Sequence, residues 1–141
     1  MLRLDLPPTG ENDILDITGL VEDIIREKKF LNGAVLIFVP GSTGALSTLE
    51  YEPGLLKDIP IALERLFPKG ITYQHDETWH DGNGHSHIRA TFIGPSLTLP
   101  VCEGKLVLGT WQQIVFLEFD NKHRKRWLSL QFFKESFESQ N

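Results

Sequence analysis

Apolar residues recur at helical spacing early in the chain. The first such segment begins at Thr18, whose hydroxyl we expect to cap the free amide groups of a helix. Lys28 and Lys29 suit the negative end of the helix dipole, so the helix should end there. One face of this helix would be apolar and would consist of Leu20, Val21, Ile24 and Ile25.

A second helical stripe runs from Leu55 to Phe67 and stops at Pro68. Pro60 conflicts with a continuous helix, because proline lacks the amide hydrogen that an interior position donates. Two alternatives remain. The helix begins around Asp58 with Pro60 in its first turn, or it is kinked at Pro60.

The rest of the chain has the pattern of strands and turns. Ala34–Val39 is a continuous apolar run, typical of a strand that is buried on both faces. Further short strands are predicted at Ile88–Ile93, Leu97–Val101, Leu106–Leu108, Trp111–Phe119 and Trp127–Phe133. Seven or eight strands with two helices predict an α+β fold, a sandwich of antiparallel-rich β-sheets with the helices packed on one side.

Length and charge limit the classes of protein that the chain can represent. Its 141 residues predict a single domain over residues 1–141, with a core at about 14–133 and a polar tail at 134–141. The 14 Lys and Arg against 19 Asp and Glu argue against binding to nucleic acid or to an anionic membrane. No apolar run reaches the length of a spanning helix or a signal peptide, so we expect a cytoplasmic location.

Histidines gather in one short window. Four of the five, His75, His80, His85 and His87, lie within residues 75–87. If the strand at 88–93 begins by residue 85, alternation places His85 and His87 on one face, and His75 could supply a third nitrogen. Three imidazoles with an open position are typical of a catalytic zinc site. The alternative is a polar loop with solvated histidines.

Other segments also carry candidate chemistry. A small-residue turn at 40–45 includes Ser42 and Thr43, whose hydroxyls could cradle an anion, although a plain tight turn is the common outcome. Asp81 lies in the histidine window and could orient a ligand. Glu50 could serve as a base or a ligand, or could lie on an exposed face. The basic run 122–126 could bind phosphate or form a solvated turn.

The run from Ser96 to Ile114, SLTLPVCEGKLVLGTWQQI, closely resembles the signature of the YjbQ-like family, also named the secondary thiamine-phosphate synthase family. The resemblance extends from about Ile14 to Phe132. It includes Glu50 and the short motifs Tyr73–His75, His87–Arg89 and Glu118–Asp120.

The resemblance implies a compact α+β fold that assembles as a homotrimer, with metal sites near the subunit interfaces. Many members carry a histidine directly after the proline of the turn, and this histidine resembles a metal ligand beside those matching His75 and His87. Here that position is Gly41, so His85 is expected to replace the missing ligand. The family name implies that a pyrimidine diphosphate ester joins a thiazole phosphate with loss of pyrophosphate. Ser42, Thr43, Arg89 or the basic run would contact phosphate.

The resulting hypothesis is a cytoplasmic, trimeric metalloenzyme with a phosphorylated small-molecule substrate. Its metal ligands are His75, His85 and His87, and zinc is the expected ion. Proton transfer or orientation of the ligands is assigned to Glu50, Asp81 or Glu118. One alternative is a non-catalytic trimer that binds a metal or a small anion, and another is a purely structural site.

Overall fold

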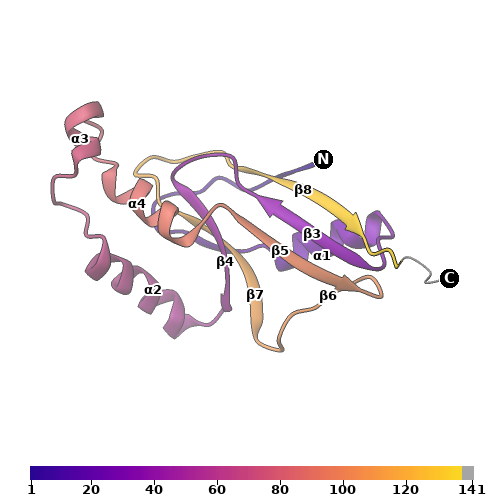
Figure 1. The fold of residues 1–141 in the computed structure, drawn as a ribbon. Helices are drawn as coiled ribbons and strands as arrows, with labels where there is room; N and C mark the ends of the chain where they lie inside the picture. The colour runs from indigo at the N-terminus through magenta and orange to yellow at the C-terminus, as the bar shows by residue number, and fades with distance from the viewer. Residues whose placement is uncertain (138–141) are drawn as a thin grey trace.

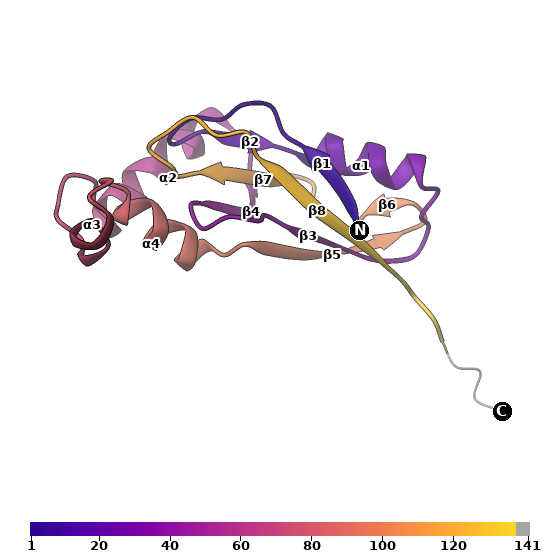
Figure 2. The same cartoon turned by 90° about the horizontal axis from the view of Figure 1, so that it is seen from above.

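Two antiparallel sheets form the centre of the molecule (Figures 1 and 2). The computed structural model describes residues 1–137. The five-stranded sheet has the order β1 (Leu2–Asp5), β8 (Trp127–Lys134), β3 (Gly33–Phe38), β5 (Ser96–Cys102) and β6 (Lys105–Leu106). The three-stranded sheet has the order β2 (Ile14–Asp16), β7 (Gln112–Glu118) and β4 (Gly44–Glu50). The predicted α+β fold with antiparallel sheets is confirmed.

The smaller sheet is covered on both faces. Side chains alternate along β7, so Ile114 and Phe116 join the main core between the two sheets. Val115 and Leu117 point the other way and form a second apolar cluster with helix residues Leu63 and Ala90. This double burial explains why β7 reads as a continuous apolar run rather than as an alternating one.

The helices number four in the described part of the chain and do not share one side. They are α1 (Thr18–Glu27), α2 (Pro53–Leu66), α3 (Gln74–Trp79) and α4 (Gly84–Ile93). Figures 1 and 2 show α2, α3 and α4 gathered at one end of the sheets, whereas α1 lies toward the other end. Val21 and Ile25 of α1 belong to the main core between the sheets. The prediction of two helices on one side was therefore wrong.

The two predicted helices are present, and α1 begins at Thr18 as expected, but the cap of each helix differs from the prediction. Thr18 does not cap α1, because its hydroxyl accepts a hydrogen bond from the Ile114 amide at 2.9 Å and so joins the helix to β7. The α2 helix begins at Pro53, and its cap is the Glu52 carboxylate, which accepts from the Gly54 amide at 2.8 Å. Pro60 therefore lies inside the helix rather than in its first turn.

The largest difference from the sequence prediction lies at residues 84–93. Ile88–Ile93 was predicted as a strand, but it forms the last part of helix α4. A short apolar run does not distinguish a buried strand from a buried helix by its periodicity. Tertiary packing decides here, because Ala90 and Ile93 of α4 pack on the apolar cluster at the outer face of β4 and β7.

Two further observations concern the ends of the chain and its helices. The predicted polar tail at 134–141 falls partly on residues 138–141, which lie outside the described residues, while Lys134 itself still belongs to β8. Within residues 1–137, none of the helices has the length and apolar character needed to cross a membrane.

Candidate metal centre and its pocket

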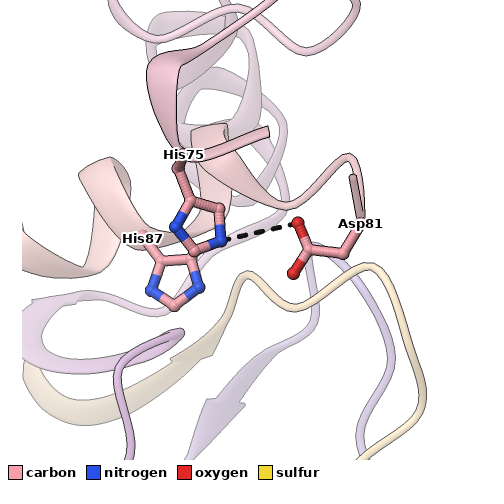
Figure 3. A group of neighbouring side chains, drawn as sticks. All are labelled: His75, Asp81 and His87. Atoms are coloured by element: carbon pink, nitrogen blue, oxygen red, sulfur yellow. Dashed lines mark ion pairs between the residues drawn. The ribbon is translucent and has the colours of Figure 1, made fainter. Parts of the chain in front are cut away.

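Two short helices bring two histidines together. His75 lies in the first turn of α3 and His87 in the first turn of α4, and their ring centroids are 4.2 Å apart. Asp81, from the loop between these helices, points its carboxylate at His75, with Oδ1 3.4 Å from Nε2 (Figure 3). One ligand atom from each of the three residues lies within 4.8 Å of the others.

The junction of α3 and α4 is held by Asp76 and Tyr73. Asp76 Oδ2 accepts from the Tyr73 amide at 3.1 Å, and its Oδ1 accepts from the Gly84 amide at 3.1 Å. The Tyr73 hydroxyl donates to the Pro68 carbonyl at 2.7 Å. Gly84 is required at this contact, because a Cβ there would lie 2.5 Å from the Tyr73 Cβ. One carboxylate thus fixes the first turns that carry His75 and His87.

The loop that carries Asp81 is fixed by left-handed turns and by hydrogen bonds. His80 and Gly82 have φ angles of 54° and 64°, so the chain reverses on both sides of Asp81. Asp81 Oδ1 accepts from the Asn83 amide at 3.1 Å. Asn121 Nδ2 donates to the Asp81 carbonyl at 2.9 Å, which connects this loop to the turn after β7.

The protonation states of these residues suit a cation. Desolvation lowers the pKa of the His87 imidazole, and the neighbouring His75 lowers it further, so the ring is neutral near pH 7. Partial burial raises the pKa of the Asp81 carboxyl, but the hydrogen bond from the Asn83 amide and the nearby His75 imidazole outweigh it and leave the pKa below its usual value. His75 Nε2 is buried and has no hydrogen-bond partner within residues 1–137. Such an unpartnered nitrogen is unfavourable unless a ligand satisfies it.

A cavity of about 380 Å³ opens beside this cluster. Asp81 and His87 line it, together with the small-residue turn after β3 and the basic turn before β8. The turn after β3 contributes Pro40, Gly41, Ser42 and Thr43, and the basic turn contributes Arg124, Lys125 and Arg126. Three candidate segments that lie far apart in the sequence therefore meet at one pocket.

Two buried carboxylates orient the arginines of the pocket. Glu118 is 0 % exposed and accepts from Arg126 Nε at 2.8 Å and from Arg126 Nη2 at 2.6 Å. Asp120 Oδ2 accepts from Arg124 Nε at 3.0 Å and from the Thr43 hydroxyl at 2.9 Å. Burial raises the pKa of the Asp120 carboxyl, but hydrogen bonds from the Lys122 amide, Thr43 and Arg124 outweigh it and lower the pKa overall. The Glu118 carboxylate thus holds the Arg126 guanidinium in place, and the Asp120 carboxylate holds that of Arg124.

The structure separates His85 from the other two histidines. Residues i and i+2 of a helix point about 200° apart, so His85 and His87 face opposite sides of α4 and not one side of a strand. His85 is 2 % exposed, and its Nε2 lies 2.8 Å from Glu11 Oε1. The prediction that His85 lies beside His87 as a metal ligand was therefore wrong. Gly41, the position at which the family resemblance implies a histidine in many members, lines the same pocket as His87.

Three other predicted site residues lie away from the pocket or have another role. Arg89 is buried, and its guanidinium donates to the Phe67 carbonyl and to Glu64 Oε2 at 2.8 Å, so it joins α4 to α2 rather than contacting a phosphate in the pocket. Glu50 is exposed at the end of β4, roughly 20 Å from the turn at 41–43. Glu118 pairs with Arg126 and is inaccessible for proton transfer.

The predicted site residues Ser42 and Thr43 do lie at the pocket. Ser42 lines it from an exposed position, whereas Thr43 is buried and accepts from Arg126 Nη2 at 2.7 Å. Asn83 and Asp120, for which the sequence predicted no role, also line the pocket. Polar residues at 118 and 120 directly after the apolar run of β7 were the available signal, since carboxylates beside a basic turn suggest paired charges.

Comparison with known proteins identifies the family. The family model described as UPF0047 protein YjbQ-like matches residues 3–135. A UPF0047 protein of Archaeoglobus fulgidus is 42 % identical over 125 residues, which cover 89 % of this chain and 95 % of the relative. The UPF0047 protein YugU of Bacillus subtilis is 33 % identical over 119 residues, covering 83 % and 87 % of the two chains.

Solved structures show the same similarity. A conserved protein of this family from Clostridium acetobutylicum superposes with a TM-score of 0.84 at 34 % identity, over 94 % of this chain and 100 % of that chain. A protein of unknown function from Sulfolobus solfataricus also gives a TM-score of 0.84 at 34 % identity, over 95 % and 97 %. The chain belongs to the YjbQ-like UPF0047 family.

Proposed function

We propose that this protein holds a divalent metal ion on His75, Asp81 and His87 and binds the phosphate group of a small-molecule substrate beside it. The observation that carries the proposal is the shared pocket: His87 and Asp81 line the same cavity of about 380 Å³ as Arg124, Lys125 and Arg126. A cavity of this volume lies within the range of small-molecule sites, which is roughly 300–1,000 Å³.

The three donors fit a transition-metal ion. Two imidazoles and one carboxylate are a donor set of catalytic zinc sites and also of non-haem iron sites. Zinc is the ion that we expect, and a neutral His87 and an ionised Asp81 need no further deprotonation to bind a divalent cation. When bound, such an ion supplies Lewis acidity and screens the negative charge of a phosphate or a leaving diphosphate.

The charges of the pocket explain why the anion and the metal would depend on each other. Its lining has three cationic residues against the carboxylates Asp81 and Asp120. Arg126 is also paired with Glu118, and Arg124 with Asp120, so the arginine charges are largely compensated within the protein. A divalent ion would leave the pocket with an excess of positive charge, which favours a phosphate. Phosphate affinity should therefore fall when the metal is removed.

The protein's own side chains would then bind and orient the substrate. The guanidinium groups of Arg124 and Arg126 are held in place by Asp120 and Glu118, so they are preorganised as phosphate donors. The Ser42 hydroxyl lies at the same pocket and can donate to a phosphate oxygen. Thiamine-phosphate synthesis, with its leaving pyrophosphate, is one reaction that such a pocket suits.

Metal analysis with matched variants tests the proposal. We expect about one zinc ion per wild-type chain after dialysis against a trace of zinc, and its loss in His87→Asn. His80→Asn is the control, because His80 lies outside the cluster and asparagine tolerates its φ of 54°. Calorimetric titration with inorganic phosphate should then show at least tenfold weaker binding to the metal-free protein.

Two outcomes would contradict the proposal. If the wild type and both variants contain the same amount of zinc, His75, Asp81 and His87 are not the metal ligands. If the affinity for phosphate is the same with and without the metal, the proposal that the metal ion and the phosphate bind in one shared pocket is wrong. If metal and phosphate bind but the purified protein forms no thiamine phosphate from the two precursors, the pocket serves another phosphorylated ligand or a non-catalytic binding role.

A further inference from the structure

A second cavity shares part of its lining with the first. It has a volume of about 310 Å³ and is lined by Gly41, Ser42, Gly44, His87, Ala90, Thr91 and Pro95. Gly41, Ser42 and His87 line both cavities. We call the first the charged cavity and the second the small-residue cavity. The proposed metal ligand His87 thus stands at the boundary between them.

The two cavities differ in chemistry. Five residues with charged side chains line the charged cavity, namely Asp81, Asp120, Arg124, Lys125 and Arg126. Apart from His87, the lining of the small-residue cavity consists of glycine, alanine, proline and two hydroxyl residues. The first therefore suits an anion, whereas the second suits an uncharged group with apolar surface.

Close contacts elsewhere in the fold favour glycine at two positions of this lining. Gly41 has a φ of 138°, and a Cβ there would lie 2.8 Å from Arg126 Nη1, so a side chain is disfavoured. At Gly44 a Cβ would come within 2.9 Å of the Phe116 ring. Thr91, one helical turn after His87, donates from Oγ1 to the His87 carbonyl at 2.8 Å, which turns its side chain back along the helix.

We propose that the two cavities bind one substrate, a phosphate ester whose anionic part lies in the charged cavity and whose uncharged, largely apolar alcohol part lies in the small-residue cavity. The ester bond would then lie beside His87, which both cavities share. This inference rests on the proposed function, because it takes the charged cavity as the phosphate site. It adds the substrate class, an ester of a compact apolar alcohol rather than a free or sugar-like phosphate.

Calorimetric titration of the zinc-loaded full chain with three probes tests the inference. The probes are inorganic phosphate, methyl phosphate and phenyl phosphate. Wild-type protein should bind phenyl phosphate at least about tenfold more tightly than methyl phosphate, which is what one buried apolar group contributes. Thr91→Trp should fill the small-residue cavity and abolish this preference, with zinc content and affinity for inorganic phosphate unchanged.

Two further variants make the comparison specific. Ala90→Leu fills the same cavity from the buried side of α4 and should also reduce the preference for phenyl phosphate. Thr78→Trp is the matched control, since Thr78 is an exposed threonine of α3 that lines neither cavity, and it should behave as the wild type.

The outcomes separate this inference from the proposed function. Equal wild-type affinities for methyl and phenyl phosphate, with inorganic phosphate still bound, would overturn the two-part site alone. A Thr91→Trp variant that weakens all three probes equally would also overturn it. If none of the three probes binds to wild-type protein, the phosphate site itself is wrong and both proposals fall.

Discussion

Glu118 is the residue on which the inner wall of the charged cavity depends. It is 0 % exposed and makes two hydrogen bonds to Arg126. Replacing one partner of a buried ion pair leaves the other charge uncompensated, so Glu118→Gln should lower the free energy of unfolding by about 3 kcal/mol. Urea denaturation measures this change. Glu50→Gln, at an exposed position of β4, should stay within about 0.5 kcal/mol, and an equal effect of the two changes would contradict our view of Glu118.

Asp120 should make the stability dependent on pH at the acid end. Its pKa in the folded protein lies below its usual value, because hydrogen bonds from the Lys122 amide, Thr43 and Arg124 outweigh its desolvation. An ionised Asp120 therefore contributes stability above the unfolded pKa of about 3.9, and this contribution is lost as the pH falls through the lower folded value.

The variant Asp120→Asn tests this dependence. At pH 7 it should be less stable than the wild type by about 2 kcal/mol, the contribution of a charged acceptor. The difference should stay constant down to about pH 5 and shrink below pH 4. Urea denaturation from pH 7 to pH 3 follows it, and a difference that grows toward low pH would have the wrong sign.

Among the elements, the contact between α3 and α4 decides the geometry of the metal centre. A Cβ at Gly84 would lie 2.5 Å from the Tyr73 Cβ, so Gly84→Ala must push the two helices apart. Because these helices carry His87 and His75, we expect at least tenfold weaker zinc binding, measured by competition with a chromophoric chelator.

Gly19→Ala supplies the matched control for this change. Gly19 lies in helix α1, and a Cβ there would meet nothing within 4 Å. Alanine in a helix is favoured over glycine, so this variant should gain about 0.5–1 kcal/mol of stability with unchanged zinc affinity. If Gly84→Ala also binds zinc as tightly as the wild type, the close helix contact is not what positions the ligands.

At the scale of the whole molecule, large apolar side chains remain exposed on a single chain. Trp79, Phe92 and Trp111 are 70 %, 73 % and 72 % exposed. Burial of such side chains between subunits would remove apolar surface from water, and we predict a homotrimer, the assembly that the family resemblance implies. Light scattering should give a mass near three times 16.0 kDa. A mass of one chain at all concentrations would contradict the prediction.

Local patterns determined much of the fold. The apolar stripe predicts α1, and the continuous apolar runs predict β3 and β7, because helix and strand periodicities are properties of neighbouring residues. The turn between β5 and β6 also uses a local preference, since Gly104 has a φ of 75°, which glycine adopts without strain. The family, too, was readable from the sequence alone.

The candidate site depended on the tertiary structure. The sequence places His75, Asp81 and His87 in one window, but it does not say that His85 faces Glu11 on the opposite side of a helix. That depended on α4 being a helix, which packing on β4 and β7 decides. Residues i and i+2 lie on the same face of a strand but on opposite sides of a helix. Predicting a strand where the chain forms α4 therefore included His85 among the metal ligands in place of Asp81.

The pocket itself belongs wholly to the tertiary structure. Its lining comes from the turn at 40–43, the loop and helix at 81–87 and the turn at 120–127. Each segment taken alone had an ordinary interpretation as a tight turn, a polar loop or a solvated charged turn. The sequence determined which side chains were available, and the pairing of β4 with β7 and the packing of α4 decided which of them meet. Such contacts are non-local, so no short stretch of sequence encodes them.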